Sequence, residues 1–237
     1  MDVPEVSRYG ALLAFFRRRG ITREVRRGDV LARSDDVAPS MFYIETGFVK
    51  AYAVNARGDQ HLHMIYGPGE FLPLLHLQQQ TRREVVYEAL IACRLLEVEP
   101  AKLEIALRSG RQLCLEMIKL AAEQYAHSLD RINSLQYRFA RERLIDCLLC
   151  LAQRFSVDSG TGYEIIVRVS HQALASKVNL SRESVSREID RLVRKGLVQV
   201  REGRIVLVDV PGLRAQLPEV VADGDTPDMV GAAVEPS

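Results

Sequence analysis

The sequence predicts an α+β protein in which a β-rich N-terminal half is joined by one long helix to a smaller C-terminal unit of helices and a hairpin. Two observations carry this prediction. Between residues 21 and 107, runs of aromatic and β-branched residues recur roughly every ten positions with Gly, Pro and Asp between them, as in antiparallel sandwiches and barrels. After residue 111, apolar residues instead recur every three or four positions, which is the period of a helix.

The expected strands of the N-terminal half lie between clear turn sequences. The run FYIETGFVKAYAV (residues 42–54) is interrupted by Gly47, and the run HLHMIY (61–66) lies between the turns NARGDQ and GPGE. A third run, VVYEALIACRLLEV, covers residues 85–98. Together they predict an antiparallel β-roll or jelly roll over residues 1–108, with a short helix at its start.

One long helix is expected over residues 109–138. Its apolar residues alternate spacings of three and four, and neither Pro nor Gly occurs between residues 111 and 159. This heptad stripe consists of Leu115, Ile118, Ala122, Tyr125, Leu129, Ile132, Gln136 and Phe139. Such a stripe is typical of a helix that pairs with a copy of itself, and the predicted dimer interface is Ile118, Ala122, Tyr125, Leu129 and Ile132. The alternative is that the stripe packs on the protein's own sheet.

Beyond this helix, the pattern predicts helix, strand, helix, turn, helix and hairpin. A helix is expected at RERLIDCLLCLAQRF (141–155), a polar break at 156–164 and a strand at IIVRV (165–169). Two helices follow, at 170–178 and after Ser181, and then a hairpin within GLVQVREGRIVLVD (196–209). This is the order of a winged helix-turn-helix, which we expect over residues 139–213.

The second helix of this unit has two different faces. Ser181 is a good N-cap, and Gly196 follows the basic end of the helix. At 100° per residue, Val185, Ile189 and Leu192 share one apolar face that would pack on the preceding helix.

The opposite face carries Arg182, Glu183 and Arg187 within the first two turns. Arginine donates two hydrogen bonds to O6 and N7 of guanine, and glutamate accepts one from N4 of cytosine. The first turns of a recognition helix are the part that enters the major groove of DNA. These three residues are therefore the predicted base contacts. The alternative is a solvated face on which the arginines and the glutamate pair with each other.

The segment LSRESVSREIDRLVRKGLV (180–198), followed by a hairpin, resembles the DNA-binding domain of the cyclic-AMP receptor protein/fumarate–nitrate regulator (CRP/FNR) family. The run FYIETGFVKAYAV resembles the family's sensor β-roll strands, and GPGEF resembles its turn. LQYRFARERLIDCLLCLA (135–152) resembles the passage from the dimer helix into the DNA-binding domain. The resemblance extends to about residue 213. It implies a cyclic-nucleotide-binding-like sensor domain and a homodimer that binds double-stranded DNA and contacts RNA polymerase. A cytoplasmic location is expected independently, because the chain has few, scattered cysteines and no apolar run long enough to span a bilayer.

The resemblance also implies roles for individual residues. Arg182, Glu183 and Arg187 match the residues that read G, C and G of a TGTGA-like half-site. The predicted phosphate contacts lie at the starts of the two helices or on the second of them: Ser170, His171, Gln172, Ser181 and Ser186. Two recognition helices one DNA turn apart would read a palindrome, with salt-dependent affinity.

The expected effector pocket departs from the family's cyclic-AMP pattern. Where cyclic-AMP binders carry Gly-Glu-Leu, this chain has Pro73, Leu74 and Leu75. Proline lacks the amide donor, and leucine cannot accept a hydrogen bond from a ribose hydroxyl. Arg83 could meet an anion, but the adjacent Glu84 would repel a phosphate. Cyclic AMP is therefore not the expected effector. The pocket residues that the resemblance implies are Leu74, Arg83, Glu84, Ser128 and Leu129.

Other cofactors receive uneven support. Residues 1–92 contain no cysteine, which argues against an iron–sulfur cluster of the family's N-terminal kind. We interpret Cys147 and Cys150 as core thiols of an apolar helix, with a redox switch as the alternative. Haem remains a candidate through His61, His63 or His76. A cyclic dinucleotide, or no effector at all, also remains open.

Two other classes of function compete with DNA binding. The HLH run resembles the HxH metal motif of cupin enzymes. Glu70, however, comes seven residues after His63 and across a turn, where that motif expects a carboxylate four or five residues on. We therefore expect neither an enzyme nor a metal site. A pure dimerisation or scaffold module would leave Arg182, Glu183 and Arg187 without a role.

Charge and hydropathy agree with these expectations. The chain has 32 basic and 31 acidic side chains, and five of the acidic ones lie after residue 214, so the preceding part carries 32 against 26 and a net charge of +6. Residues 214–237 are predicted to form a disordered acidic tail. No apolar run reaches the roughly 18 to 20 residues that span a bilayer. The four cysteines are too few and too scattered for a disulfide scaffold.

Overall fold

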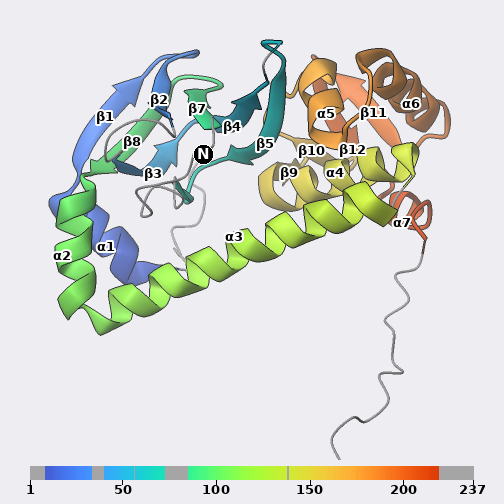
Figure 1. Ribbon diagram of the computed structural model, residues 1–237. Helices are drawn as coiled ribbons and strands as arrows, with labels where there is room; N and C mark the ends of the chain where they lie inside the picture. The colour runs from blue at the N-terminus through green and yellow to red at the C-terminus, as the bar shows by residue number, and fades with distance from the viewer. Residues whose placement is uncertain (1–8, 34–39, 56, 73–84, 138, 219–237) are drawn as a thin grey trace, which may run out of the picture.

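The computed structural model describes residues 9–33, 40–55, 57–72, 85–137 and 139–218 (Figure 1). The N-terminal domain consists of two antiparallel sheets, with strand orders β1-β8-β3-β6 and β2-β7-β4-β5. Its strands are β1 (Ile21–Val25), β2 (Val30–Arg33), β3 (Met41–Thr46), β4 (Val49–Val54), β5 (Gln60–Tyr66), β6 (Phe71–Leu72), β7 (Val85–Ala89) and β8 (Cys93–Val98). The predicted β-roll is confirmed.

Local sequence explains where these strands turn. Gly47 separates β3 from β4 with a φ of 95°, and a Cβ atom there would lie 2.5 Å from Cys93 Sγ. Only glycine meets both conditions without strain. The sheets enclose a core that includes the fully buried side chains of Phe42, Ile44 and Leu95.

Three helices follow or flank the roll: α1 (Gly10–Arg19), α2 (Pro100–Ser109) and α3 (Arg111–Tyr137). Helix α2 was not predicted from the sequence, although it begins with a proline in its first turn. Helix α1 packs on α3, where the buried Glu116 accepts hydrogen bonds from the backbone N–H groups of Ala11 (3.1 Å) and Leu12 (2.8 Å). One carboxylate of α3 thus caps the start of α1, whose N-cap residue makes no side-chain cap.

Helix α3 runs along both domains (Figure 1). Its face toward α1 and α2 buries Leu113, Met117 and Leu120. The predicted stripe lies on another face, and the apolar side chains of Ile118 and Tyr125 are largely exposed there. All eight stripe residues are exposed. The described part of the chain leaves this stripe uncovered, which contradicts the alternative that it packs on the protein's own sheet.

The C-terminal domain contains four helices and one sheet of order β11-β12-β10-β9 among its described residues. Its elements are α4 (Ala140–Phe155), β9 (Ser156–Asp158), β10 (Tyr163–Ile165), α5 (His171–Val178), α6 (Arg182–Arg194), β11 (Val198–Arg201), β12 (Arg204–Leu207) and α7 (Val210–Arg214). This is a winged helix-turn-helix, as predicted. Helix α3 ends at Tyr137, and α4 begins at Ala140.

One predicted strand is wrong. Residues 165–169 were expected to form it, but the strand is β10, which ends at Ile165 and pairs with β9 inside the predicted polar break. Gly160 and Gly162, with φ values of 74° and 144°, close a tight turn between them, so the strand begins at Tyr163. Helix α7 was also not anticipated. None of the helices in the described ranges combines the length and the hydrophobicity that crossing a bilayer requires.

Candidate DNA-binding interface

Helix α6 begins and packs as its sequence predicts. The Ser181 hydroxyl oxygen accepts a hydrogen bond from the backbone N–H of Ser184 at 3.1 Å, which caps the helix. Val185, Ile189 and Leu192 are completely buried in the core of the C-terminal domain. Since this face is held against the domain, the opposite face of α6 must point outward.

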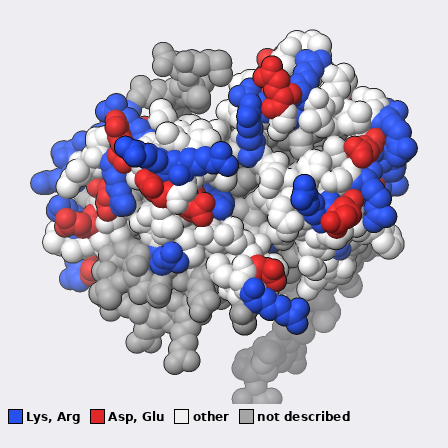
Figure 2. Space-filling view, turned by 90° about the horizontal axis from the view of Figure 1, so that it is seen from above, with Lys and Arg blue, Asp and Glu red and all other residues white. Residues whose placement is uncertain are grey.

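The outward face presents the three predicted base contacts. Arg182, Glu183 and Arg187 are all exposed. The pKa of Glu183 lies below its usual value because its own backbone N–H, the Ser181 hydroxyl and the two arginines stabilise the carboxylate. Glu183 is therefore ionised at neutral pH and can only accept hydrogen bonds. Arg187 Nη2 lies 3.3 Å from the Ser184 hydroxyl. In Figure 2, Lys and Arg side chains gather at the right-hand end, where this domain lies, with acidic side chains among them.

The predicted phosphate contacts have different surroundings. Ser170 caps α5 by accepting from the Ala173 N–H at 3.1 Å, and Gln172 is exposed beside it. His171 Nδ1 lies 2.8 Å from the Ser186 hydroxyl, so these two side chains join α5 to α6. Ser170 and Gln172 are thus better placed to meet a ligand than His171 and Ser186.

The turn between α5 and α6 depends on Asn179, which was not predicted from the sequence as a structural residue. Asn179 ends α5 in a left-handed conformation, with φ of 53°. Arg143 of α4 donates to the carbonyl oxygens of Val178 (2.9 Å) and Asn179 (3.4 Å), which α5 leaves without helical partners. Asparagine after a helix is a known C-terminal signal, but no sequence pattern links it to an arginine 36 residues earlier.

The predicted effector pocket is only partly described. Leu74, Arg83 and Glu84 lie outside the described residues, as does His76. Ser128 is exposed on α3 and donates to the Gln124 carbonyl oxygen at 2.9 Å. Leu129 belongs to the exposed stripe. The pocket therefore remains a prediction.

The surroundings of the cysteines and histidines bear on the proposed redox and haem roles. Cys147 is buried, and burial raises the pKa of its thiol to about 11, which supports its interpretation as a core thiol. Cys150 is only half-buried, so its interpretation as a buried core thiol is wrong. His61 lies 3.3 Å from the Asn55 amide, whereas His63 Nδ1 lies 2.9 Å from Arg131 Nη1. Within the described ranges, no three His, Cys, Asp or Glu side chains gather as a metal site would need.

The contact between the two domains was not foreseen either. Strand β5, at the edge of its sheet, lies against α5. The Leu62 N–H donates to the Ser176 hydroxyl at 2.6 Å, and Lys177 Nζ donates to the His63 carbonyl oxygen at 2.9 Å. Burial lowers the pKa of Lys177. These contacts fix α5 relative to the β-roll.

A β-roll, a long helix with an exposed apolar stripe and a winged helix with an exposed Arg-Glu-Arg face define a two-domain DNA-binding transcription regulator. Comparison with family models agrees: the Crp-like helix-turn-helix domain matches residues 142–216, and the cyclic nucleotide-binding domain matches residues 22–109. The chain belongs to the CRP/FNR family of transcription regulators.

Relatives resemble the chain over most of its length. The transcriptional regulatory protein btr of Bordetella pertussis is 24% identical, covering 80% of this chain and 78% of its own. The structure of FixK2 from Bradyrhizobium japonicum has a TM-score of 0.74 at 21% identity, covering 84% of this chain and 98% of its own. CLP of Xanthomonas campestris, described as a c-di-GMP responsive global regulator, has a TM-score of 0.70 at 21% identity, with the same coverages.

Proposed function

We propose that two copies of this chain bind a palindrome of TGTGA-like half-sites, with Arg182 and Arg187 reading guanines and Glu183 accepting from a cytosine. The observation that carries the proposal is the outward face of α6. Two guanidinium groups and an ionised carboxylate lie in its first two turns, while its other face is fixed in the core. This is the donor and acceptor set that a G·C-rich major-groove edge requires.

The exposed stripe of α3 supports the homodimer. A second copy would cover side chains such as Ile118 and Tyr125 and place the two α6 helices on one side of a duplex. Ser170 and Gln172 would contact phosphates, which makes the affinity salt-dependent. RNA polymerase is the proposed protein partner in transcription.

We further propose that the effector is not cyclic AMP, or that the chain binds DNA without one. The Pro-Leu-Leu sequence at residues 73–75 supports this, because it lacks the donor and acceptor that a cyclic nucleotide needs. Haem and a cyclic dinucleotide are the alternatives. The likeness to CLP favours testing the dinucleotide first.

Fluorescence anisotropy with a labelled TGTGA-N6-TCACA duplex tests the proposal at fixed salt. Specific binding by the unliganded full chain, compared with a scrambled duplex, is expected if the protein is already DNA-competent. Specific binding only after adding haem or a cyclic dinucleotide would identify an effector. Equal binding to both duplexes under all conditions would contradict the proposed operator.

A further inference from the structure

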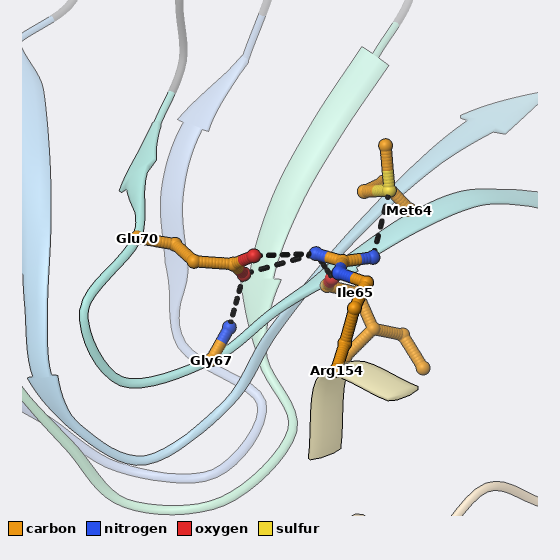
Figure 3. A network of polar contacts seen from close by, with 5 residues as sticks. All are labelled: Met64, Ile65, Gly67, Glu70 and Arg154. Atoms are coloured by element: carbon orange, nitrogen blue, oxygen red, sulfur yellow. Dashed lines mark hydrogen bonds and ion pairs between the residues drawn. The ribbon is translucent and has the colours of Figure 1, made fainter. Parts of the chain in front are cut away.

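The turn that joins β5 to β6 in the sensor domain meets the last turn of α4 in the DNA-binding domain. Figure 3 shows the Arg154 side chain of α4 pointing to the Glu70 carboxylate. Arg154 Nη2 lies 2.8 Å from Glu70 Oε1, 3.0 Å from Oε2 and 2.8 Å from the Ile65 carbonyl oxygen. The Gly67 N–H donates to Glu70 Oε2 at 2.8 Å. We call Glu70 and Arg154 the interdomain ion pair.

Aromatic packing surrounds this pair. The Arg154 guanidinium lies 4.5 Å from the ring centroid of Phe155, and that ring meets Phe48 of the sensor domain edge to face at 5.4 Å. A Cβ atom on Gly67 would lie 2.6 Å from Phe155 Cε1. The close approach of the Phe155 ring from the other domain therefore leaves no room for a side chain at Gly67, so this position requires glycine.

The interdomain ion pair is well placed to connect the two functions of the chain. Glu70 directly precedes β6, after which residues 73–84 contain three of the predicted pocket residues. Arg154 lies on α4, whose buried face packs in the same core as α6. The side chains of Arg154 and Glu70 are 17% and 33% exposed, so the pair is shielded from much of the solvent. Removing one partner would leave the other poorly solvated.

We propose that Glu70 and Arg154 are positioning residues, which fix the DNA-binding domain on the sensor domain and thereby set the spacing of the two recognition helices in the dimer. This inference rests on the proposed binding of a palindrome. Two half-sites are read together only if both α6 helices lie one DNA turn apart. A looser contact between the sensor domain and the DNA-binding domain therefore weakens binding to the palindrome and leaves binding to one half-site unchanged.

The test compares Glu70→Gln, Arg154→Met and the double variant with the wild-type chain. Lys50→Met is the matched control, since it breaks an ion pair with Glu88 that is similarly shielded, at 18% and 20% exposure, but lies within the sensor sheet. The first measurement needs no DNA. It is the rate of hydrogen exchange at the Leu62 amide, which donates a hydrogen bond to the Ser176 hydroxyl of the other domain.

Each single variant is expected to raise the Leu62 exchange rate about tenfold, because a hydrogen bond to a charged group contributes at least about 1.4 kcal/mol, the equivalent of a factor of ten. The double variant should exchange no faster than the singles, and Lys50→Met should match the wild type. Unchanged exchange in Glu70→Gln and Arg154→Met would overturn the proposal.

The second measurement is the affinity for the palindrome and for a duplex with one half-site. The variants are expected to lose about tenfold on the palindrome alone. Faster exchange with unchanged palindrome affinity would overturn the positioning role. If the wild-type chain does not prefer the palindrome to scrambled DNA, the proposed function fails, and the exchange rates alone decide whether the pair holds the domains together.

Discussion

Ile118 offers a direct way to test whether the stripe on α3 is a dimer interface. Its side chain is 62% exposed in the single chain, near the middle of the sensor-proximal half of the helix. In a dimer built on the stripe, the two copies of Ile118 would each lose this exposed surface. The change to examine is Ile118→Ala, which removes apolar atoms and keeps a good helix former.

The size of the effect follows from the exposed surface. Burying a whole isoleucine side chain contributes about 1.5–3 kcal/mol, so burying 62% of it contributes about 1–2 kcal/mol per copy. Alanine retains a small part of this. With two copies in each dimer, the dissociation constant should rise roughly 10- to 100-fold, since about 1.4 kcal/mol corresponds to a factor of ten.

Sedimentation equilibrium over a range of protein concentrations measures this constant. Ile105→Ala is the matched control, because Ile105 is 70% exposed but lies on α2, away from the stripe. The control should dissociate like the wild type. An Ile118→Ala variant that dimerises as tightly as the wild type, or an equal change in both variants, would refute the stripe as the interface.

Three further predictions concern stability and reactivity. Burial alone would raise the pKa of Glu116, but hydrogen bonds from the backbone N–H groups of Leu12 and Ala11 and from the Gln112 side chain lower it. The carboxylate therefore adds stability above pH 4.5, and this stability is lost as the pH falls through the lower folded-state pKa. Measured by urea unfolding, the free energy of unfolding of Glu116→Gln should be lower than that of the wild type at pH 7, and the two values should converge in acid. Ser181→Ala should lower the free energy of unfolding by about 0.5–2 kcal/mol through loss of the α6 cap, whereas Ser128→Ala within α3 should not; equal effects would contradict the capping role. In the native protein, Cys147 should resist alkylation at pH 9, because its thiol remains buried and protonated, and it should react once the chain is unfolded in urea. Rapid labelling at Cys147 itself, mapped separately from the less buried Cys114 and Cys150, would argue for a redox role.

The sequence predicted those elements whose cause is local. The signals for α6 all lie within about sixteen residues: the helical period of its apolar residues, the Ser181 cap and the glycine that follows its end. The burial of Val185, Ile189 and Leu192 follows from that period. The exposed stripe of α3 follows from heptad spacing in the same way. Gly47 signalled a break between strands because its conformation is a property of one residue.

Contacts between distant segments could not be predicted. Arg143, Arg154 and Glu116 each bind groups from 35 to 105 residues away, and no spacing in the chain encodes such pairs. The error at residues 165–169 has a different origin. An apolar run does not by itself specify a strand, because a buried segment without strand pairing has the same composition. Here the hydrogen-bonded pairing with β9, and not the hydrophobicity of the run, decides that β10 covers Tyr163–Ile165.

The most direct test of DNA reading by α6 is a competition assay with single-base substitutions across the half-site, comparing the wild type with Arg182→Ala and Arg187→Ala at fixed salt. Each variant is expected to lose about 1–3 kcal/mol of discrimination at one guanine and to keep its preferences elsewhere. If both variants bind every sequence more weakly by the same factor, these arginines contact only phosphates, and the proposed reading of bases by α6 is wrong.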